Sequence, residues 1–203
     1  MHKLLSKDFF NRPTLQVAQE LLGKFLVRKI GHRKIFGIIT EVEAYIGPKD
    51  KASHASRGRT KRTEVMFGKP GYWYVYLIYG MYYCLNIVTE KEHYPAAVLI
   101  RSIVTSDSHS NILKNIRIDE VRGPGKVCKY FKIDKRFNAK HANKKTGLWI
   151  AAHSPSERAS PNKVGREDYG IKISPRQIKR GKRIGVDYAG KWKDKPWRFY
   201  VVG

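Results

Sequence analysis

Two glutamates separated by one residue could do acid–base chemistry. Glu41 and Glu43 flank Val42 in the segment EVEAYIGPKDKASHASRGR, residues 41–59. Because side chains alternate along an extended strand, both carboxylates are expected on the same face. Neighbouring carboxylates repel each other, and one of them could remain as a general base where the surroundings are otherwise positive. The ordinary alternative is a pair of solvated glutamates at the end of a strand.

The same segment carries two flat rings that could hold a planar ligand. Tyr45 follows the glutamates, and the Gly47-Pro48 turn leads into a loop that contains His54. The phenol and the imidazole could flank a bound flat molecule. An isolated histidine is more often structural, so the combination with Glu43 makes this stretch a candidate site.

A second aromatic cluster lies at residues 72–83, YWYVYLIYGMYY, which hold six of the twelve tyrosines. The two-residue period of a strand separates Tyr72, Tyr74 and Tyr76 from Trp73, Val75 and Leu77. One face can therefore enter a core while the other presents rings to a ligand, with Tyr79 near an exposed tip. The alternative is that all of them are ordinary strand aromatics.

The charge of the chain indicates which class of partner such rings could contact. Lys and Arg total 41 against 17 Asp and Glu, a net charge of +24 spread along the whole chain. This excess favours a polyanionic partner, nucleic acid first, because neutralising phosphates releases bound counterions. An anionic membrane surface comes second, since no basic helix shows a sustained apolar face. A very soluble basic protein without such a partner remains the alternative.

Length and composition favour a globular intracellular protein. The chain has 203 residues, of which 41% are hydrophobic, enough for one core. It has no apolar run of membrane-spanning length, and the start MHKLLSKDFFNRPT is a poor signal peptide. The two cysteines, Cys84 and Cys128, exclude a multi-disulfide framework, a cysteine-rich zinc site and the signature of a zinc base deaminase. No nucleotide-binding glycine loop follows a strand.

The elements that must position these residues suggest one domain, residues 1–203. Pro13 or Thr14 starts a predicted helix with apolar residues at helical spacing, and Gly23 ends it. Residues 106–150 are predicted as helix and loop, with the turn RGPGK before the apolar-spaced VCKYFKI. Tyr79-Gly80-Met81 is predicted to turn a hairpin. Strands are expected at residues 25–30, 34–46, 72–79, 81–89, 96–104, 148–152, 182–189 and 196–202. We therefore expect an α+β domain around a curved, mostly antiparallel β-sheet with flanking helices.

Five segments resemble, in the same order, the alkyladenine (3-methyladenine) DNA glycosylase family. They are EVEAYIGPKDKASHASRGRT, MFGKPGYWYVYLIYGMYYCLNIV, AAVLIRSI, RGPGKVC and RIGVDYAGKWKDKPWRFYV. The resemblance covers nearly all of residues 5–203 and is weakest between about 104 and 120. It implies a monofunctional enzyme that flips a damaged purine out of double-stranded DNA and hydrolyses the N-glycosidic bond without cutting the strand. It also implies a protruding β-hairpin that inserts into DNA.

The resemblance assigns catalytic roles to three positions. Glu43 matches the general base that activates a water for attack on C1′, a role typically worth about 10²–10⁴ in rate. Arg101 matches an arginine that helps to hold this water, and its charge would keep Glu43 ionised. Ile184 matches a position whose backbone carbonyl also holds the water. Arg101 could instead be a phosphate contact at the edge of a strand.

The resemblance also assigns the aromatic residues. Tyr45, His54 and Tyr76 match the residues that sandwich the flipped base, and Tyr79 matches the residue that fills the vacancy in the duplex. Such stacking is worth about 1–3 kcal/mol per base, comparable to the cost of extruding one. Asn86 matches a position that rejects guanine through its 2-amino group, although it could simply satisfy backbone groups in a strand. The positions matching groove or phosphate contacts are Met81, Tyr82 and Lys126.

The expected substrates are alkylated purines such as 3-methyladenine and 7-methylguanine. Their positive charge makes the base a better leaving group and favours its contact with electron-rich aromatic rings. Neutral lesions such as hypoxanthine and ethenoadenine would need protonation, and the sequence leaves their acceptance open. No metal, organic cofactor, membrane or obligate protein partner is implied. We expect a monomer in a bacterial cytoplasm, associated with the nucleoid through DNA.

Two other classes stay open at this point. A bifunctional glycosylase with lyase activity would need an amine nucleophile, and lysines abound, but no helix-hairpin-helix pattern is present and His2 rather than proline follows Met1. A noncatalytic nucleic-acid-binding module would use the charge and the tyrosines but would not require Glu43.

Overall fold

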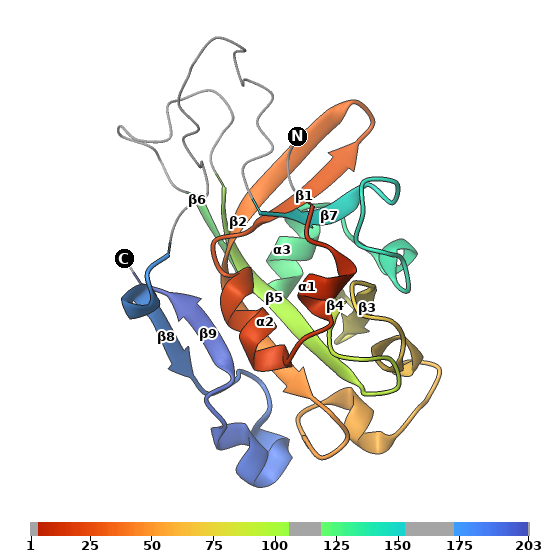
Figure 1. Ribbon diagram of the computed structural model, residues 1–203, viewed down its shortest axis with the longest axis vertical. Helices are drawn as coiled ribbons and strands as arrows, with labels where there is room; N and C mark the ends of the chain where they lie inside the picture. The colour runs from red at the N-terminus through yellow and green to blue at the C-terminus, as the bar shows by residue number, and fades with distance from the viewer. Residues whose placement is uncertain (1–3, 106–118, 153–172, 203) are drawn as a thin grey trace.

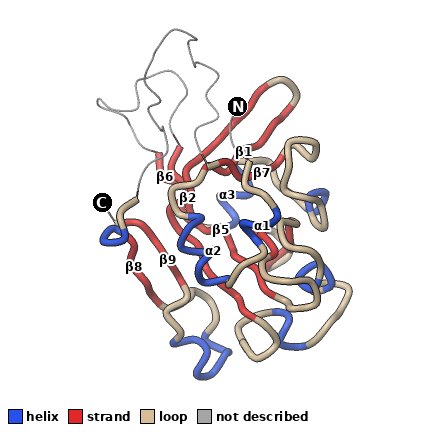
Figure 2. The backbone as a smooth tube through the Cα atoms, viewed as in Figure 1, coloured by secondary structure: helices blue, strands red, loops and turns tan. Residues whose placement is uncertain are grey.

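The frame of the molecule is one antiparallel sheet. The computed structural model describes residues 4–105, 119–152 and 173–202. Its strands run in the order β3-β4-β5-β2-β1-β7, with β6 added to β5 and the pair β8–β9 added to β2 (Figures 1 and 2). The strands are β1 Phe25–Ile30, β2 Arg33–Ile46, β3 Trp73–Ile78, β4 Tyr82–Val88, β5 Ala96–Thr105, β6 Asp119–Arg122, β7 Leu148–Ala151, β8 Ile178–Gly181 and β9 Arg198–Val201.

Strand β2 organises this sheet because it is long enough to have two partners on one side. Its first half pairs with β1, and residues 41–43 pair with β9, while β5 pairs along the other side. The register between β2 and β5 shifts on both sides of Glu41. Such an irregularity bends a strand and increases its twist, so the shift redirects the second half of β2, which carries the candidate site.

Alternation along the strands divides the sheet into a core face and a polar face. Val42 and Ala44 of β2, Trp73 and Val75 of β3, and Val98 of β5 belong to the main buried cluster. The side chains between them therefore point to the opposite face. That face receives Glu43, Tyr45, Tyr74, Tyr76, Asn86 and Arg101.

Three short α-helices and five 3₁₀-helices accompany the sheet in the described ranges. The amphipathic helix α2 buries Val17, Ala18 and Leu21 in the main cluster, together with Val127 and Cys128 of α3. The predicted helix from Pro13 or Thr14 is confirmed, since α2 begins at Thr14 and ends at Leu21, just before Gly23. The helices are α1 Lys7–Phe10, α2 Thr14–Leu21, α3 Pro124–Tyr130, η1 His54–Arg57, η2 Glu64–Phe67, η3 Lys135–Phe137, η4 Pro175–Gln177 and η5 Asp187–Asp194.

The hairpin between β3 and β4 has the predicted turn. Tyr79 and Gly80 have φ of 52° and 69°, and the N–H of Met81 donates to the carbonyl of Ile78 over 3.2 Å. Two successive positive φ angles match the twist of a two-residue hairpin loop. Tyr79, at the turn, is 80% exposed, and Met81 is 65% exposed.

Two predictions about the second half of the chain are corrected. Residues 182–189 do not form a strand: β8 ends at Gly181, and η5 begins at Asp187. The cause is a buried Arg183 side chain, which donates hydrogen bonds to the Asp50 carboxylate and to the carbonyl of Ala44, and a left-handed Gly185 with φ of 74°. Within the range predicted as helix and loop, residues 119–122 form β6, because pairing with β5 outweighs a weak local pattern. Residues 106–118 lie outside the described residues.

Candidate active site

The strand register places four residues from distant segments in one row. Glu43 on β2 pairs with Leu99 on β5, Leu99 pairs with Asn86 on β4, and Asn86 pairs with Tyr74 on β3. Neighbouring strands are about 4.8 Å apart, so the row brings the glutamate of the first motif within reach of the aromatic hairpin. The sheet itself therefore assembles the candidate site.

Glu43 is the centre of this site. Its side chain is 0% exposed, although it carries a carboxyl group. Oε1 accepts a hydrogen bond of 2.8 Å from the backbone N–H of Ile184. Oε2 accepts one of 2.8 Å from the hydroxyl of Tyr45 and lies 3.4 Å from Nη1 of Arg101. Both carboxyl oxygens are thus oriented by groups that favour a negative charge.

Opposing effects act on the pKa of Glu43. Burial raises this pKa above that of an exposed glutamate, whereas the charge of Arg101, the Ile184 N–H and the Tyr45 hydroxyl lower it. Arg101 therefore acts in the expected direction, but burial outweighs it. A carboxylate with a raised pKa accepts a proton more readily than an ordinary one, which suits a general base.

Glu41 fixes the arginine that contacts Glu43. Its carboxylate accepts hydrogen bonds from Arg101 Nε at 3.2 Å, from Ser102 Oγ at 2.9 Å and from Arg198 Nη1 at 3.1 Å. Arg101 thus bridges the two glutamates, which agrees with their predicted placement on one face. Glu41 pairs with two arginines, Arg101 and Arg198, so the buried Glu43 is the better candidate for a general base.

An aromatic wall of three residues lies on the polar face. The rings of His54 and Tyr76 meet edge to face with centroids 4.6 Å apart, and Nδ1 of His54 lies 3.0 Å from the hydroxyl of Tyr74. Burial, followed by the charges of Arg62 and Arg57, lowers the pKa of His54 to about 4. The imidazole is consequently neutral at neutral pH.

A buried ion pair, which the sequence analysis did not predict, packs against the ring of Tyr45. The guanidinium carbon of Arg183 lies 4.9 Å from the Tyr45 ring centroid and 5.0 Å from that of Trp197. Its nitrogens donate to the Asp50 carboxylate at 2.5 and 2.8 Å, and both side chains are 0% exposed. The pair joins the loop after β2 to the segment carrying Ile184. Neither residue belongs to a periodic sequence pattern from which the ion pair could have been predicted.

Asn86 lies in the row but is engaged with the backbone. Its Nδ2 donates to the carbonyl of Tyr74 at 3.1 Å and to that of Cys84 at 3.4 Å. This is the structural use that the sequence left open. Rejection of guanine by Asn86 stays a prediction.

The residues predicted to touch DNA gather at the hairpin and beside it. Tyr79, Met81 and Tyr82 are exposed in or next to the turn. The start of α3 packs against this hairpin, since a Cβ on Gly125 would lie 3.0 Å from the Tyr82 side chain. Lys126, the next residue, is exposed. The sheet and this glycine contact thus bring the predicted contact residues into one region.

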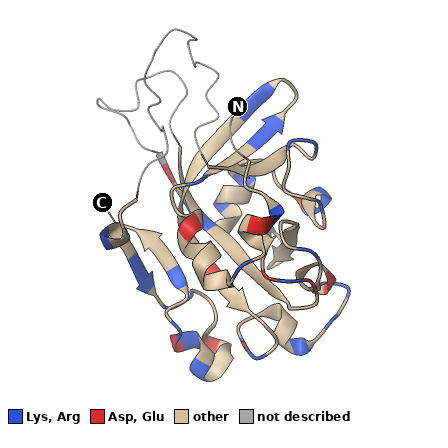
Figure 3. Cartoon of the chain, in the orientation of Figure 1, with Lys and Arg blue, Asp and Glu red and all other residues tan. Residues whose placement is uncertain are grey.

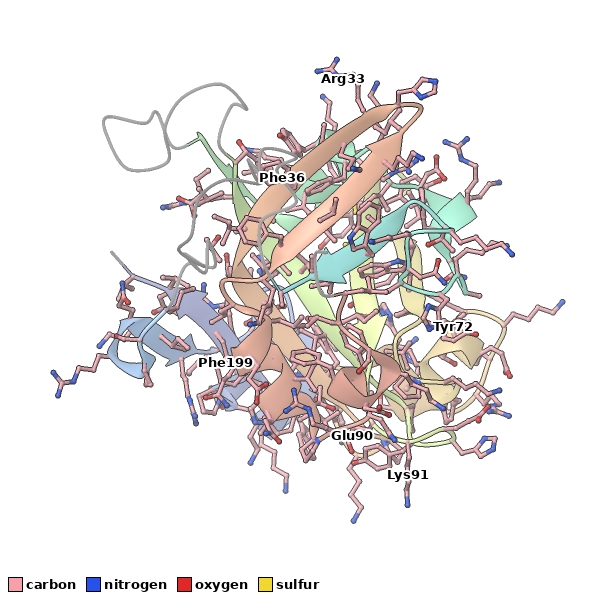
Figure 4. The ribbon with its side chains drawn as sticks, turned by 45° about the horizontal axis from the view of Figure 1, so that its top comes forward. Arg33, Phe36, Tyr72, Glu90, Lys91 and Phe199 are labelled. Carbon is pink, nitrogen blue, oxygen red and sulfur yellow. The ribbon has the colours of Figure 1, made fainter. Side chains whose placement is uncertain are left out.

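Charge is spread over the surface rather than confined to the site. Figure 3 shows Lys and Arg on several strands and loops, and Figure 4 places Arg33 at the outer end of the β1–β2 hairpin. Within residues 4–105, 119–152 and 173–202, no group of three or more His, Cys, Asp or Glu is placed to hold a metal. In the same part of the chain, no helix is long and apolar enough to cross a membrane.

Comparison with known proteins identifies the class as DNA glycosylase. Residues 8–203 match the family described as "Methylpurine-DNA glycosylase (MPG)". The chain belongs to this family.

Curated relatives agree over nearly the whole chain. A protein of Methanocella arvoryzae is 45% identical over 202 residues, covering 97% of this chain and 92% of the relative. One from Legionella pneumophila strain Paris is 44% identical over 201 residues, covering 99% and 95%. One from Ehrlichia ruminantium strain Gardel is 53% identical over 138 residues, covering 68% of each. All three bear the name "Putative 3-methyladenine DNA glycosylase".

Proposed function

We propose that this protein is a monofunctional DNA glycosylase that flips alkylated purines, 3-methyladenine and 7-methylguanine among them, out of duplex DNA and hydrolyses the N-glycosidic bond. Neutral lesions such as hypoxanthine and ethenoadenine are included as candidate substrates. The observation that carries the proposal is the placement of Glu43. It is a fully buried carboxylate, held by Tyr45, Ile184 and Arg101 next to an aromatic wall.

In the proposed reaction, Glu43 acts as the general base. A water beside the carboxylate attacks C1′ of the flipped nucleotide while its proton passes to Glu43. The bond between C1′ and the purine nitrogen breaks, and its electron pair leaves with the base. A cationic purine becomes neutral in this step, so its departure needs no further proton. Arg101 stabilises the carboxylate before the reaction, and the Ile184 N–H fixes its orientation.

The flipped base would bind between the ring of Tyr45 and the pair His54–Tyr76. Electron-rich rings attract a cation, which favours an alkylated purine over a normal one. The neutral imidazole of His54 adds no repulsive charge. Tyr79, exposed at the hairpin turn, would enter the duplex and occupy the space that the base leaves.

The test uses three substrates: a duplex with one 7-methylguanine, a duplex with one hypoxanthine, and an undamaged duplex. Release of free base would be measured directly, and strand breaks would be scored with and without hot alkali. Release with breaks only after alkali is expected, because the reaction leaves an abasic site. Breaks without alkali would indicate a lyase. Tight binding to all three duplexes without release would indicate a noncatalytic nucleic-acid-binding module.

A further inference from the structure

Two arginines contact the proposed base-binding tyrosines, and their charges differ in how they are compensated. Arg183 lies 4.9 Å from the Tyr45 ring and is paired with Asp50. Arg62 lies 5.1 Å from the Tyr76 ring, measured from the guanidinium carbon to the ring centroid. Arg62 forms no ion pair with a carboxylate among the described residues. Arg62 therefore places a positive charge without a paired carboxylate against the Tyr76 ring, and Arg57 adds a second charge that acts on His54.

The position of Arg62 makes its charge effective at the wall. It lies in the segment between η1 and η2 and is exposed, so the chain does not need it for a core. Its charge is felt by His54, whose protonated form it disfavours, and by Tyr74, whose ionised form it favours. A guanidinium that influences three of the rings would also influence a base placed against them.

We propose that Arg62 is a specificity-determining residue that lowers the preference of the enzyme for cationic purines and so widens its range toward neutral ones. This inference rests on the proposed function. The face of Tyr76 would attract a cationic base, but Arg62 already makes a cation–π contact with that ring and repels a second positive charge. A neutral base is not repelled. The aromatic wall alone would select for charge, and Arg62 opposes that selection.

The experiment compares single-turnover release of 7-methylguanine and of hypoxanthine from duplexes that differ only in the lesion. The variant Arg62→Gln removes the charge, and Arg62→Lys keeps it with a different shape. Arg59→Gln is the matched control. Arg59 is an exposed arginine three positions earlier, but it stacks on Phe67 at 5.0 Å and pairs with Glu64 at 3.6 Å.

The measured quantity is the ratio of the 7-methylguanine rate to the hypoxanthine rate. In Arg62→Gln this ratio is expected to rise about five-fold or more, the size expected when one of two unit charges a few ångströms apart is removed at a partly solvated site. Arg62→Lys and Arg59→Gln are expected to keep the wild-type ratio. Because Arg62 is exposed, its variants are expected to fold, which a thermal unfolding curve checks.

Equal loss of both rates in Arg62→Gln would overturn the inference and make Arg62 a general phosphate contact. A wild type that releases 7-methylguanine but no hypoxanthine would also overturn it, while leaving the proposed function intact. A wild type that releases neither base would overturn the proposed function itself, together with the inference.

Discussion

The backbone N–H of Ile184 donates a hydrogen bond of 2.8 Å to Oε1 of Glu43, from a residue 141 positions further along the chain. The family resemblance assigned the carbonyl of Ile184 to the catalytic water, and that role stays a prediction. The observed hydrogen bond gives Ile184 a different role, which uses its N–H rather than its carbonyl. A donor fixed by the backbone holds the carboxylate in one orientation, so its free lone pairs face a constant direction.

Glu43→Gln is expected to reduce base release by about 10²-fold or more, since an amide cannot accept the proton of the attacking water. The substitution keeps the shape of the side chain, so affinity for lesion-containing duplex should change little. Single-turnover release and a binding titration on the same duplex measure the two quantities. Glu20→Gln, at an exposed residue of α2 paired with Arg12, is the control. Comparable loss of release and of binding would mean that Glu43 is structural.

Base release is expected to decline at acidic pH as Glu43 becomes protonated, because only the ionised carboxylate can act as a base. Burial raises the pKa of Glu43, so this decline should lie at higher pH than for an exposed glutamate. Arg101→Gln removes a charge that lowers this pKa, and the decline should move to still higher pH. Rates between about pH 4 and 8 would show it.

The control for this pH profile is Arg198→Gln, because Arg198 contacts Glu41 and not Glu43 in the ion pairs of the described residues. It should leave the acidic decline nearly in place. An unchanged profile in Arg101→Gln, with only a lower rate, would instead place Arg101 at a phosphate.

Tyr79→Ala is expected to weaken capture of the flipped base. Loss of one stacking ring costs about 1–3 kcal/mol, or roughly 5- to 150-fold in affinity for lesion-containing duplex. Because Tyr79 is 80% exposed, the free energy of unfolding should be unaffected. A fluorescent base opposite or next to the lesion reports the unstacking directly. Leu77→Ala, in the same hairpin but not at the turn, should behave as wild type, and equal affinities for all three proteins would contradict the insertion role.

Asp50→Asn is expected to lower the free energy of unfolding by about 3–5 kcal/mol, because it leaves the buried Arg183 guanidinium without its counter-charge. Urea denaturation measures this change. Asp134→Asn, at a surface pair with Arg136, should cost far less. A loss as small as that of the control would show that water or another group compensates Arg183.

The sequence predicted the elements whose patterns are local. Helix α2 follows from a proline start and apolar spacing, and the β3–β4 turn follows from Tyr79-Gly80, where glycine tolerates a positive φ. The two faces of β3 follow from alternation, since Trp73 and Tyr74 enter different buried clusters. Each of these is decided by a few neighbouring residues.

Contacts between distant segments could not be predicted in this way. Arg183 leaves the strand pattern because its partner, Asp50, lies 133 positions earlier, and neither residue carries a periodic signal. Arg62 is one of 41 basic residues, and only the folded chain shows that it lies over Tyr76. Residue types and alternation indicated the Glu41–Glu43 pair, and the family resemblance then selected Glu43 and added Arg101 and Ile184. The groups that hold Glu43 were seen only in the structure.

The row from Glu43 through Leu99 and Asn86 to Tyr74 ties activity to the correct folding of the sheet. Because side chains alternate, a slip of one residue in any of these strands would exchange its site face for its core face. The slipped strand would bury polar groups and expose apolar ones, so such a molecule would be poorly stable as well as inactive. Activity and stability should therefore be lost together when the register of one of these strands is disturbed.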